Sequence, residues 1–337
     1  GCEIGGFAGD ALPVAKLLAS ASGCLVTHPN VMNGGSLSEK DERIFYVEGF
    51  HLDQFAKGKI GLQRVNQQKI GIIFDSSIDK EILERHLQVV DACIATLGIN
   101  IESYVVTDEP LGVVINNQDS GISGGIIKNP ATLISAGEKL LKKGITAIAI
   151  VANFPDQSNI QEVDLYREGN GIDPISGAEA VISHIVSKFL KVPCAHAPAL
   201  MPIDLKYNLD PRAAAEEIGY TFLPSVLIGL STAPDLVDLD TSNKNISLHP
   251  DDIDSIVVPS GALGGEAVLA CMERDIRVIS VVNSGILDIN NSKLKYQNFI
   301  EVNNYFEAAG IILSFREGIN HKSIRRPLKS FKDSQVL

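Results

Sequence analysis

The stretch Asp254–Val282 limits the possible folds more than any other part of the chain. Apolar residues at 255–259 indicate a buried strand, a glycine-bearing turn follows at 260–265, and a helix is expected to begin near Glu266. A second apolar run, Arg277–Val282, completes a strand–helix–strand unit. Two strands joined through a helix lie parallel in one sheet, and ligands of such folds bind outside the carboxyl ends of the strands.

The rest of the chain repeats this alternation of strands and helices. Apolar runs predict strands at 23–27, 44–47, 69–74, 103–106, 144–152, 192–195, 299–302 and 311–315. Amphipathic or capped segments predict helices at 11–20, 50–56, 78–97, 129–143, 177–190, 210–217 and 303–309. The pattern predicts the α/β class, with mostly parallel sheets flanked by helices and built from Rossmann-like βαβ units.

Residues 1–316 are expected to form one α/β unit, either continuous or divided into two lobes. The stretch 111–130 interrupts the rhythm with two short apolar runs around a polar turn. It predicts a hairpin or a flap, and it is the candidate boundary between lobes. The segment 317–337 is predicted to be an exposed, partly disordered tail, and it is rich in basic residues. Its basic side chains are Lys322, Arg325, Arg326, Lys329 and Lys332.

The charge and the cysteine pattern exclude several classes of protein. A formal net charge of −12 argues against non-specific binding to nucleic acids or membrane surfaces, which favour a basic face. We expect no membrane span and no signal peptide, because no apolar run approaches the required length. The five cysteines include no C-x-x-C pair and lie mostly in apolar runs, which favours reduced thiols and a cytoplasmic location.

Polar residues follow most of the expected strands. If the strands are parallel, these residues meet at one edge of a sheet and form a single cleft. The candidate ligand-binding residues of this kind are Asn30, Asp108, Asn153, Asn283 and Ser284. His28 and His196 also follow strands, and a histidine there is a candidate general acid or base near neutral pH. Asp10, before the first helix, is the third candidate catalytic residue, with capping of that helix as the alternative.

Two glycine-rich helix starts are candidate anion sites, because glycine lets backbone N–H groups approach a phosphate or carboxylate. Their residues are Gly5, Gly6 and Gly9 in the first, and Ser260, Gly261, Gly264 and Gly265 in the second. The alternative is that these glycines serve only tight turns and close packing. Neither stretch is a G-x-G-x-x-G or Walker A motif, so no nucleotide cofactor is identified. No zinc-binding motif and no G-x-S-x-G elbow is present, so neither a metal site nor a serine hydrolase is expected.

The chain resembles an uncharacterised bacterial family of unknown function that is common in photosynthetic bacteria. The resemblance spans nearly the whole chain and rests on specific strings at Gly5–Pro13, Thr27–Asn30, Val106–Asp108, Pro193–Ala199 and Ala213–Pro224. It implies a single full-length unit. It implies no activity and transfers no catalytic residue.

These observations favour a protein of small-molecule metabolism that binds an anionic metabolite at the carboxyl edge of its sheet. An enzyme of the group-transfer or lyase type is the first expectation. A non-catalytic metabolite sensor and a structural or assembly protein are the alternatives, and the sequence leaves formation of a homo-oligomer open.

Overall fold

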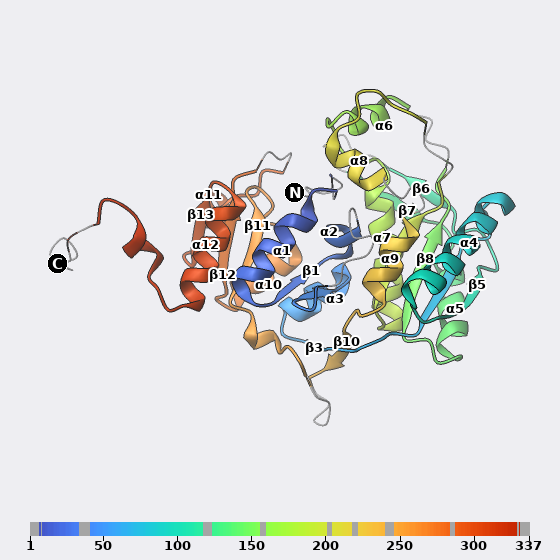
Figure 1. Ribbon diagram of the computed structural model, residues 1–337, viewed down its shortest axis with the longest axis horizontal. Coiled ribbons are helices and arrows are strands. Elements are labelled where there is room, and N and C mark those ends of the chain that lie inside the picture. Colours follow the sequence, from blue (N-terminus) through green and yellow to red (C-terminus); the bar gives the residue numbers. More distant parts are fainter. Residues whose placement is uncertain are drawn as a thin grey trace.

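Two parallel sheets, each covered by helices, form two lobes joined by the segment that follows the first helix (Figure 1). The structure, a computed structural model, describes residues 7, 9–33, 41–116, 123–155, 160–200, 204–217, 222–239, 246–283, 287–328 and 330. The expected α/β class is confirmed, with the strands divided between several sheets.

The larger lobe contains a four-stranded parallel sheet of order β5-β4-β8-β9. Its strands are β4 (Ile70–Phe74), β5 (Ile101–Val106), β8 (Ala147–Ala152) and β9 (Cys194–Pro198). Its helices are α4 (Lys80–Leu97), α5 (Pro130–Leu141), α7 (Ser176–Leu190) and α9 (Leu223–Leu230). Alternate residues of β4 and β8 pack against α4 and α9 on one face and against α5 and α7 on the other. Burial on both faces explains why these strands are continuous apolar runs.

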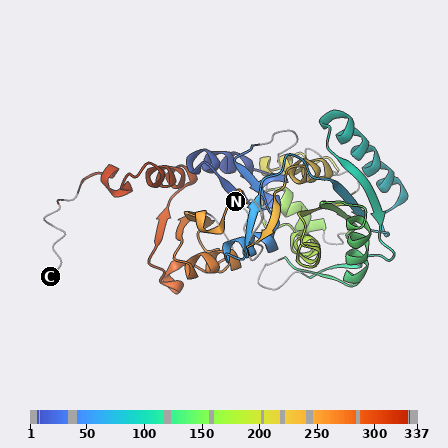
Figure 2. The ribbon, with the colours of Figure 1, turned by 90° about the horizontal axis from the view of Figure 1, so that it is seen from below.

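The smaller lobe contains the parallel sheet β11-β12-β13. Its strands are β11 (Ser255–Pro259), β12 (Arg277–Val281) and β13 (Phe299–Val302), and its helices are α1 (Ala11–Ser22), α10 (Glu266–Glu273), α11 (Asn291–Leu294) and α12 (Tyr305–Arg316). Helix α10 packs on one face of this sheet, and α1 and α12 pack on the other. The first and last long helices therefore lie side by side, as Figures 1 and 2 both show.

Short elements connect the lobes and cover their edges. They are β1 (Leu25–Thr27), α2 (Pro29–Asn33), β2 (Ile44–Tyr46), α3 (Gly49–Ala56), β3 (Ile60–Gln63), α6 (Ile160–Arg167), α8 (Pro211–Glu217), β10 (Asp235–Asp238), η1 (Pro250–Asp252) and η2 (His321–Ile324). Strands β1 and β2 pair in parallel, and β3 and β10 pair antiparallel. Helix α3 packs against both α7 of the larger lobe and α10 of the smaller lobe.

The hairpin expected within 111–130 is present, because β6 (Val113–Ile115) and β7 (Gly125–Ile127) pair antiparallel. It packs against α7. The strands β4 and β8, on either side of it in the sequence, are neighbours in one sheet. The structure thus places this segment within the larger lobe. The residues of the tail that the structure describes extend away from the smaller lobe (Figure 1).

The expected strand at 311–315 is wrong, because these residues continue helix α12 to Arg316. Ala308, Ile311 and Ile312 are buried at helical spacing against the β12–β13 face. A short apolar run does not by itself distinguish a strand from a buried helix. The helices α6 and α9 and the strands β3 and β10 were not expected from the sequence, since their segments are either too polar or too uniformly apolar to show a period.

Candidate functional site

His196 lies inside a strand rather than after it, because β9 runs on to Pro198. Its side chain is 6% exposed and faces α7. The Nδ1 atom lies 3.0 Å from the Ser183 hydroxyl, and Nε2 lies 3.9 Å from a carboxylate oxygen of Glu179. Ser183 and Glu179 are one helical turn apart on α7, so both reach the same ring.

His28 follows β1, as expected, and lies close enough to His196 for its charge to lower the pKa of that ring. Its Nδ1 accepts a hydrogen bond of 3.1 Å from the backbone N–H of Asn30. Its Nε2 lies beside Gly49, at the start of α3. Burial lowers the pKa of His28 to about 4, and burial followed by the effect of His28 lowers that of His196 to about 3. Both imidazoles are therefore neutral at pH 7.

Two carboxyl groups near the start of α7 hold their protons at unusually high pH. Burial, followed by the charge of Glu216, raises the pKa of Asp173 to about 7. Burial, followed by the charges of Asp173 and Glu216, raises the pKa of Glu179 well above its ordinary value. Desolvation and neighbouring like charges both disfavour the ionised form of a carboxyl group. The site therefore combines neutral imidazoles with Asp173, whose pKa is about 7, and Glu179, whose pKa is raised.

Helices α6 and α8 hold the N-terminal segment beside this carboxyl cluster. The rings of Phe7 and Tyr166 stack at 4.4 Å, and the Arg212 guanidinium lies 3.9 Å from the centre of the Phe7 ring. Glu216 accepts hydrogen bonds from the Gly9 N–H at 3.1 Å and from the Tyr166 hydroxyl at 2.5 Å. A Cβ at Gly9 would lie 2.1 Å from the Arg212 carbonyl oxygen, so this glycine permits close packing.

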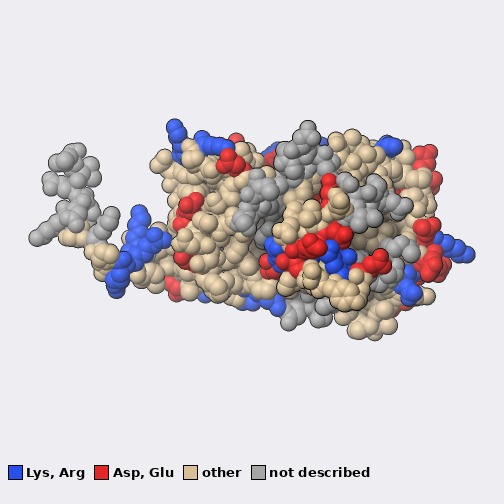
Figure 3. All heavy atoms as spheres, turned by 90° about the horizontal axis from the view of Figure 1, so that it is seen from above, with Lys and Arg blue, Asp and Glu red and all other residues tan. Residues whose placement is uncertain are grey.

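The outer side of α6 and α8 carries paired charges. Figure 3 shows acidic and basic side chains gathered near the middle of the upper face. The ion pairs of this region are Lys206–Asp164 at 2.7 Å, Lys206–Glu168 at 3.1 Å and Arg167–Glu217 at 2.7 Å. These pairs tie α6 to α8 and to the preceding loop.

The second glycine-rich helix start is a packed turn. The N–H groups of Ser260, Ala262 and Leu263 donate to the carbonyl oxygens of other residues in the smaller lobe. Gly261 has φ +93°, and a Cβ there would lie 2.2 Å from the Leu287 carbonyl oxygen, so glycine is required. These contacts support the packing alternative for Ser260 and Gly261.

The start of α10, which follows this turn, faces acidic side chains. Gly264 and Gly265 are exposed, and the next residue, Glu266, is paired with Lys57. The Asp53 carboxyl group accepts a hydrogen bond from the Ala267 N–H. An anionic ligand at this helix start would compete with the carboxyl groups already there, so we place no anion site at Gly264 and Gly265.

The carboxyl ends of β4 and β8 meet through Asp75 and Asn153. The chain leaves these adjacent strands toward opposite edges of the sheet, so this is the point where a crevice is expected. Asp75 is 2% exposed and accepts hydrogen bonds from the N–H groups of Ser77, Leu111 and Asn153. The Asn153 side chain donates to Ser77 at 3.1 Å. These bonds fix the loops that follow the two strands.

The remaining candidates lie apart from the histidine pair or outside the described residues. Asp10 is exposed, makes no side-chain capping bond and lies near Arg212, so it does not join the histidines. Asp108 is exposed and paired with Lys139 at 2.7 Å. Asn283 is half-buried at the end of β12. Gly5, Gly6 and Ser284 lie outside the residues that the structure describes.

The sequence did not indicate that side chains of α7 lie beside His196. Glu179, Ser183 and Ser187 recur every fourth residue and are buried, although the neighbouring Ile182 and Val186 suggest an ordinary apolar face. A polar stripe on the buried side of a helix is the signal that could have identified them. Within the described ranges, no group of three or more His, Cys, Asp or Glu side chains is arranged to hold a metal ion.

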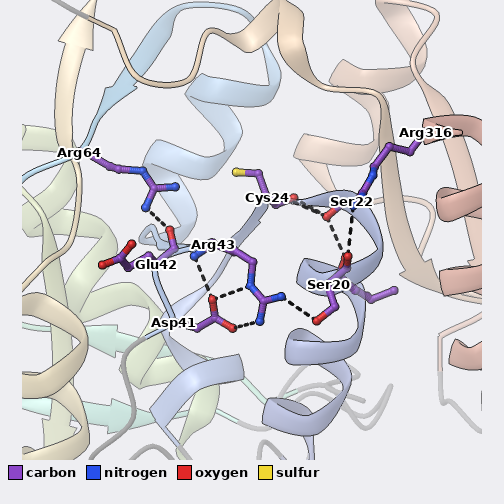
Figure 4. Close-up of polar contacts among 9 residues, drawn as sticks. Ser20, Ser22, Cys24, Asp41, Glu42, Arg43, Arg64 and Arg316 are labelled. Carbon is purple, nitrogen blue, oxygen red and sulfur yellow. Dashed lines mark hydrogen bonds and ion pairs between the residues drawn. The ribbon is translucent and has the colours of Figure 1, made fainter.

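A second polar cluster lies at the other end of β1, around the C-terminal end of α1 (Figure 4). Arg43 forms two hydrogen bonds of 2.9 and 2.6 Å with the Asp41 carboxylate and donates to the Ser20 hydroxyl at 2.9 Å. Arg316 of α12 donates to the carbonyl oxygens of Ser20 and Ala21, at 3.3 and 3.1 Å. Cations at a helix C-terminus bind the last carbonyl groups and stabilise the helix dipole. This cluster therefore joins the end of α1 to α12 and to the residues that precede β2.

Comparison with known proteins gives a family and a curated relative. A family model described as "Protein of unknown function (DUF3326)" matches residues 1–325. A protein of Synechococcus sp. (strain ATCC 27144 / PCC 6301 / SAUG 1402/1), named an uncharacterised lipoprotein, is 44% identical over 321 residues. The alignment covers 95% of this chain and 89% of the relative. No solved structure matches the chain. In the part of the chain that is described, no helix is both long and apolar enough to cross a membrane.

Proposed function

The chain belongs to the DUF3326 family of proteins of unknown function, and we propose that it is an enzyme that transfers a proton on a small carboxylate-bearing metabolite. The observation that supports this most is the approach of the His196 ring to Glu179, at 3.9 Å, beside a second neutral imidazole. Titratable groups with strongly shifted pKa values, gathered in one place, are typical of catalytic sites.

We assign the proton transfer to the carboxyl pair of Glu179 and Asp173. A general acid or base works best when its pKa lies near the working pH, and the pKa of Asp173 is raised to about 7. The pKa values of His28 and His196 lie far below neutrality, so their rings act as neutral hydrogen-bonding groups. Because the Nδ1 atom of His28 accepts from Asn30, its proton is on Nε2 and is available to a substrate oxygen. A neutral imidazole can polarise a substrate oxygen in this way.

The charges of the site favour a carboxylate ligand over a phosphate. Glu179, whose pKa is raised, can donate a hydrogen bond to a carboxylate oxygen, and the ionised form of Asp173, whose pKa is about 7, can accept the proton that is removed from the substrate. A phosphate carries nearly two negative charges near pH 7 and would be repelled by the Glu216 charge that already raises both pKa values. We propose lyase-type chemistry, which begins with removal of a proton, in preference to group transfer.

We place the protein in the cytoplasm, on the pattern of its thiols. Cys24, Cys93, Cys194 and Cys271 are free. The Synechococcus relative is named a lipoprotein, and a lipid anchor is the competing placement. Intact-mass measurement of the protein from the soluble and membrane fractions of its native cells distinguishes the two. An acyl chain on Cys2 would overturn the cytoplasmic placement.

The function is tested with a panel of small carboxylates and phosphates, first by thermal shift and then by NMR in D₂O. We expect a carboxylate to raise the melting temperature of the wild-type protein. A ligand at a hundredfold excess over its Kd contributes about 2.7 kcal/mol. The same carboxylate is expected to exchange a carbon-bound proton for deuterium.

Glu179→Gln separates catalysis from binding, because the amide replaces the protonated carboxyl group as a hydrogen-bond donor but transfers no proton. We expect this variant to keep the thermal shift and to lose deuterium exchange. Glu138→Gln, on the exposed side of α5, is the matched control and is expected to retain both. Absence of any ligand in the panel, or exchange that survives in Glu179→Gln, would contradict the proposal.

A further inference from the structure

We infer that Glu48 and Ser183 are positioning residues that fix the tautomer of His196, with the proton on Nδ1 and with Nε2 as an acceptor facing Glu179. The inference concerns the same site as the proposed function and rests on it for its catalytic meaning. Its test detects directly which ring nitrogen of His196 carries the proton, and it needs no substrate.

Glu48 is an unusual residue for its position. It precedes α3 in an extended conformation, and its carboxylate accepts a hydrogen bond of 2.8 Å from the Phe50 N–H, so it is the N-cap of the helix. Short side chains such as Ser, Thr, Asp and Asn are normally preferred there. Glu48 is also only 4% exposed, and burial of a carboxylate is costly unless it is hydrogen-bonded. Capping of α3 alone does not require a glutamate.

The second carboxylate oxygen of Glu48 reaches α7. Its Oε1 lies 3.4 Å from the Ser183 hydroxyl, a long hydrogen bond, and the buried Ser187 lies near the same carboxylate. The extra methylene of glutamate, compared with aspartate, extends the cap toward these serines. Glu48 thus joins the start of α3 to the stripe of polar residues on the buried side of α7.

The direction of the hydrogen bonds follows from the proton count. The Ser183 hydroxyl has one proton, and its two acceptors besides His196 are Glu48, at 3.4 Å, and the Ala180 carbonyl oxygen, at 3.5 Å. The Glu48 Oε1 is buried and needs a hydrogen-bond donor, and the Ser183 hydroxyl is the side-chain donor that reaches it, so we assign the serine proton to Glu48. The serine oxygen then accepts from His196, and the 3.0 Å contact is an Nδ1–H donating to Oγ.

The opposite side of the ring favours the same tautomer. Nε2 lies 3.9 Å from the Glu179 carboxyl group, and burial, followed by the charges of Asp173 and Glu216, raises the pKa of that group, which favours its protonated form. If Nε2 carried the proton, two donors would face each other. With the proton on Nδ1, the lone pair of Nε2 is directed toward the proton of Glu179. His28 has the opposite arrangement, since its Nδ1 accepts from Asn30, so the two rings present one acceptor and one donor.

The test is the long-range ¹H–¹⁵N spectrum of the full-length protein with labelled histidines, which distinguishes protonated from unprotonated ring nitrogens. We expect wild-type His196 to show a protonated Nδ1 and an unprotonated Nε2 at pH 7. His86 is an internal control, because its Nδ1 contacts the Ile82 carbonyl oxygen at 2.8 Å and must be protonated in every variant.

Two variants change the hydrogen bonds that join His196, Ser183 and Glu48 in different ways. Ser183→Ala removes the acceptor of Nδ1–H, so we expect His196 to become a mixture of tautomers. Glu48→Gln keeps an oxygen for the Phe50 N–H but can place an amide N–H toward Ser183. The serine would then turn its proton to Nδ1, and we expect the Nε2–H form to dominate.

Several outcomes would overturn the inference. They are a wild-type His196 with its proton on Nε2, and an unchanged His196 signal in both variants while the His86 signal shows that the fold is intact. If either variant fails to fold, the wild-type tautomer and the remaining variant still decide. If His196 carries its proton on Nδ1 but the protein binds no carboxylate, the tautomer assignment is confirmed and the proposed function is rejected. The failure of one proposal can therefore be told apart from the failure of the other.

Discussion

The two polar clusters at opposite ends of β1 differ in the charge of their side chains: one contains paired ions and the other contains buried groups with shifted pKa values. Around Asp41 and Arg43, ions of opposite sign meet within 3 Å near the surface, and the pKa of Asp41 falls to about 2. Around His196 and Glu179, burial lowers the pKa of the imidazole and raises that of the carboxyl group, so it favours the uncharged form of both groups. Exposed pairs stabilise by attraction, whereas buried groups without a counter-ion change their protonation state. The second arrangement includes a carboxyl group, Asp173, whose pKa lies near 7.

The largest expected difference between the clusters is in stability. His196→Ala removes a buried ring and leaves a cavity, so we expect the free energy of unfolding to fall by about 2–4 kcal/mol. Arg316→Ala removes an exposed side chain from the end of α1, and we expect a loss of about 1 kcal/mol or less. Guanidinium chloride unfolding at pH 7 measures both. An equal loss in the two variants would remove the energetic distinction between the clusters.

The second difference is the sign of the pH dependence. The folded-state pKa of Asp173 is raised to about 7, so its contribution to stability is fully present below its ordinary value of 3.8 and is lost as pH rises through 7. The Asp173→Asn variant has no carboxyl group to ionise here, so its free energy of unfolding should not fall in this way. We therefore expect the variant to gain stability relative to the wild type as the pH rises from 4 to 7. Urea unfolding at a series of pH values measures the difference.

Asp41 is the matched control with the opposite sign. Its folded-state pKa is lowered to about 2, so its contribution is present above 3.8 and is lost as pH falls toward 2. Asp41→Asn is therefore expected to lose stability relative to the wild type at neutral pH, and the difference should shrink on acidification. The same sign of pH dependence in both variants would contradict the assignment of Asp173 to a buried, proton-holding site.

A smaller effect is expected from Gly49→Ala. A Cβ there would lie 3.3 and 3.4 Å from two atoms of the His28 ring, so the ring must move by a few tenths of an ångström. We expect a loss of about 1 kcal/mol, a changed His28 signal in the ¹H–¹⁵N spectrum and weaker carboxylate binding. Gly264→Ala is the control, because its Cβ would make only an ordinary contact with Ile289. An unchanged His28 signal in Gly49→Ala would show that the His28 ring does not lie beside Gly49.

The smallest effect is expected from Asp108→Ala. The Asp108–Lys139 pair lies on the surface, with side chains 62% and 45% exposed, and such pairs contribute about 0–1 kcal/mol. We expect almost unchanged unfolding and an unchanged ligand-induced thermal shift. Loss of that thermal shift would return Asp108 to the site, as the sequence first suggested.

The sequence predicted the class of fold and singled out His28 and His196 as candidates, but it did not indicate Glu179 or Asp173. His28 and His196 were recognisable as polar residues in or after apolar runs. Glu179 and Ser183 are hidden inside an amphipathic helix, where a single Glu or Ser is usually on the solvent side. Only the packing of α7 on β9 turns that side of the helix inward. A polar residue after a strand, such as Asp108, looks the same in the sequence whether it faces a cleft or the solvent.

The sequence by itself determined the alternation of buried strands and amphipathic helices, because hydrophobic periodicity is a local property. It also determined that glycine occupies the tight turn at Gly261, where the backbone adopts a positive φ. The tertiary structure decided that the strands form two sheets and that α12 is one helix. It also decided that His28, His196, Glu179 and Asp173 come close to one another. Burial and the proximity of charges depend on segments far apart in the chain, so the protonation states of the site are a property of the folded molecule alone.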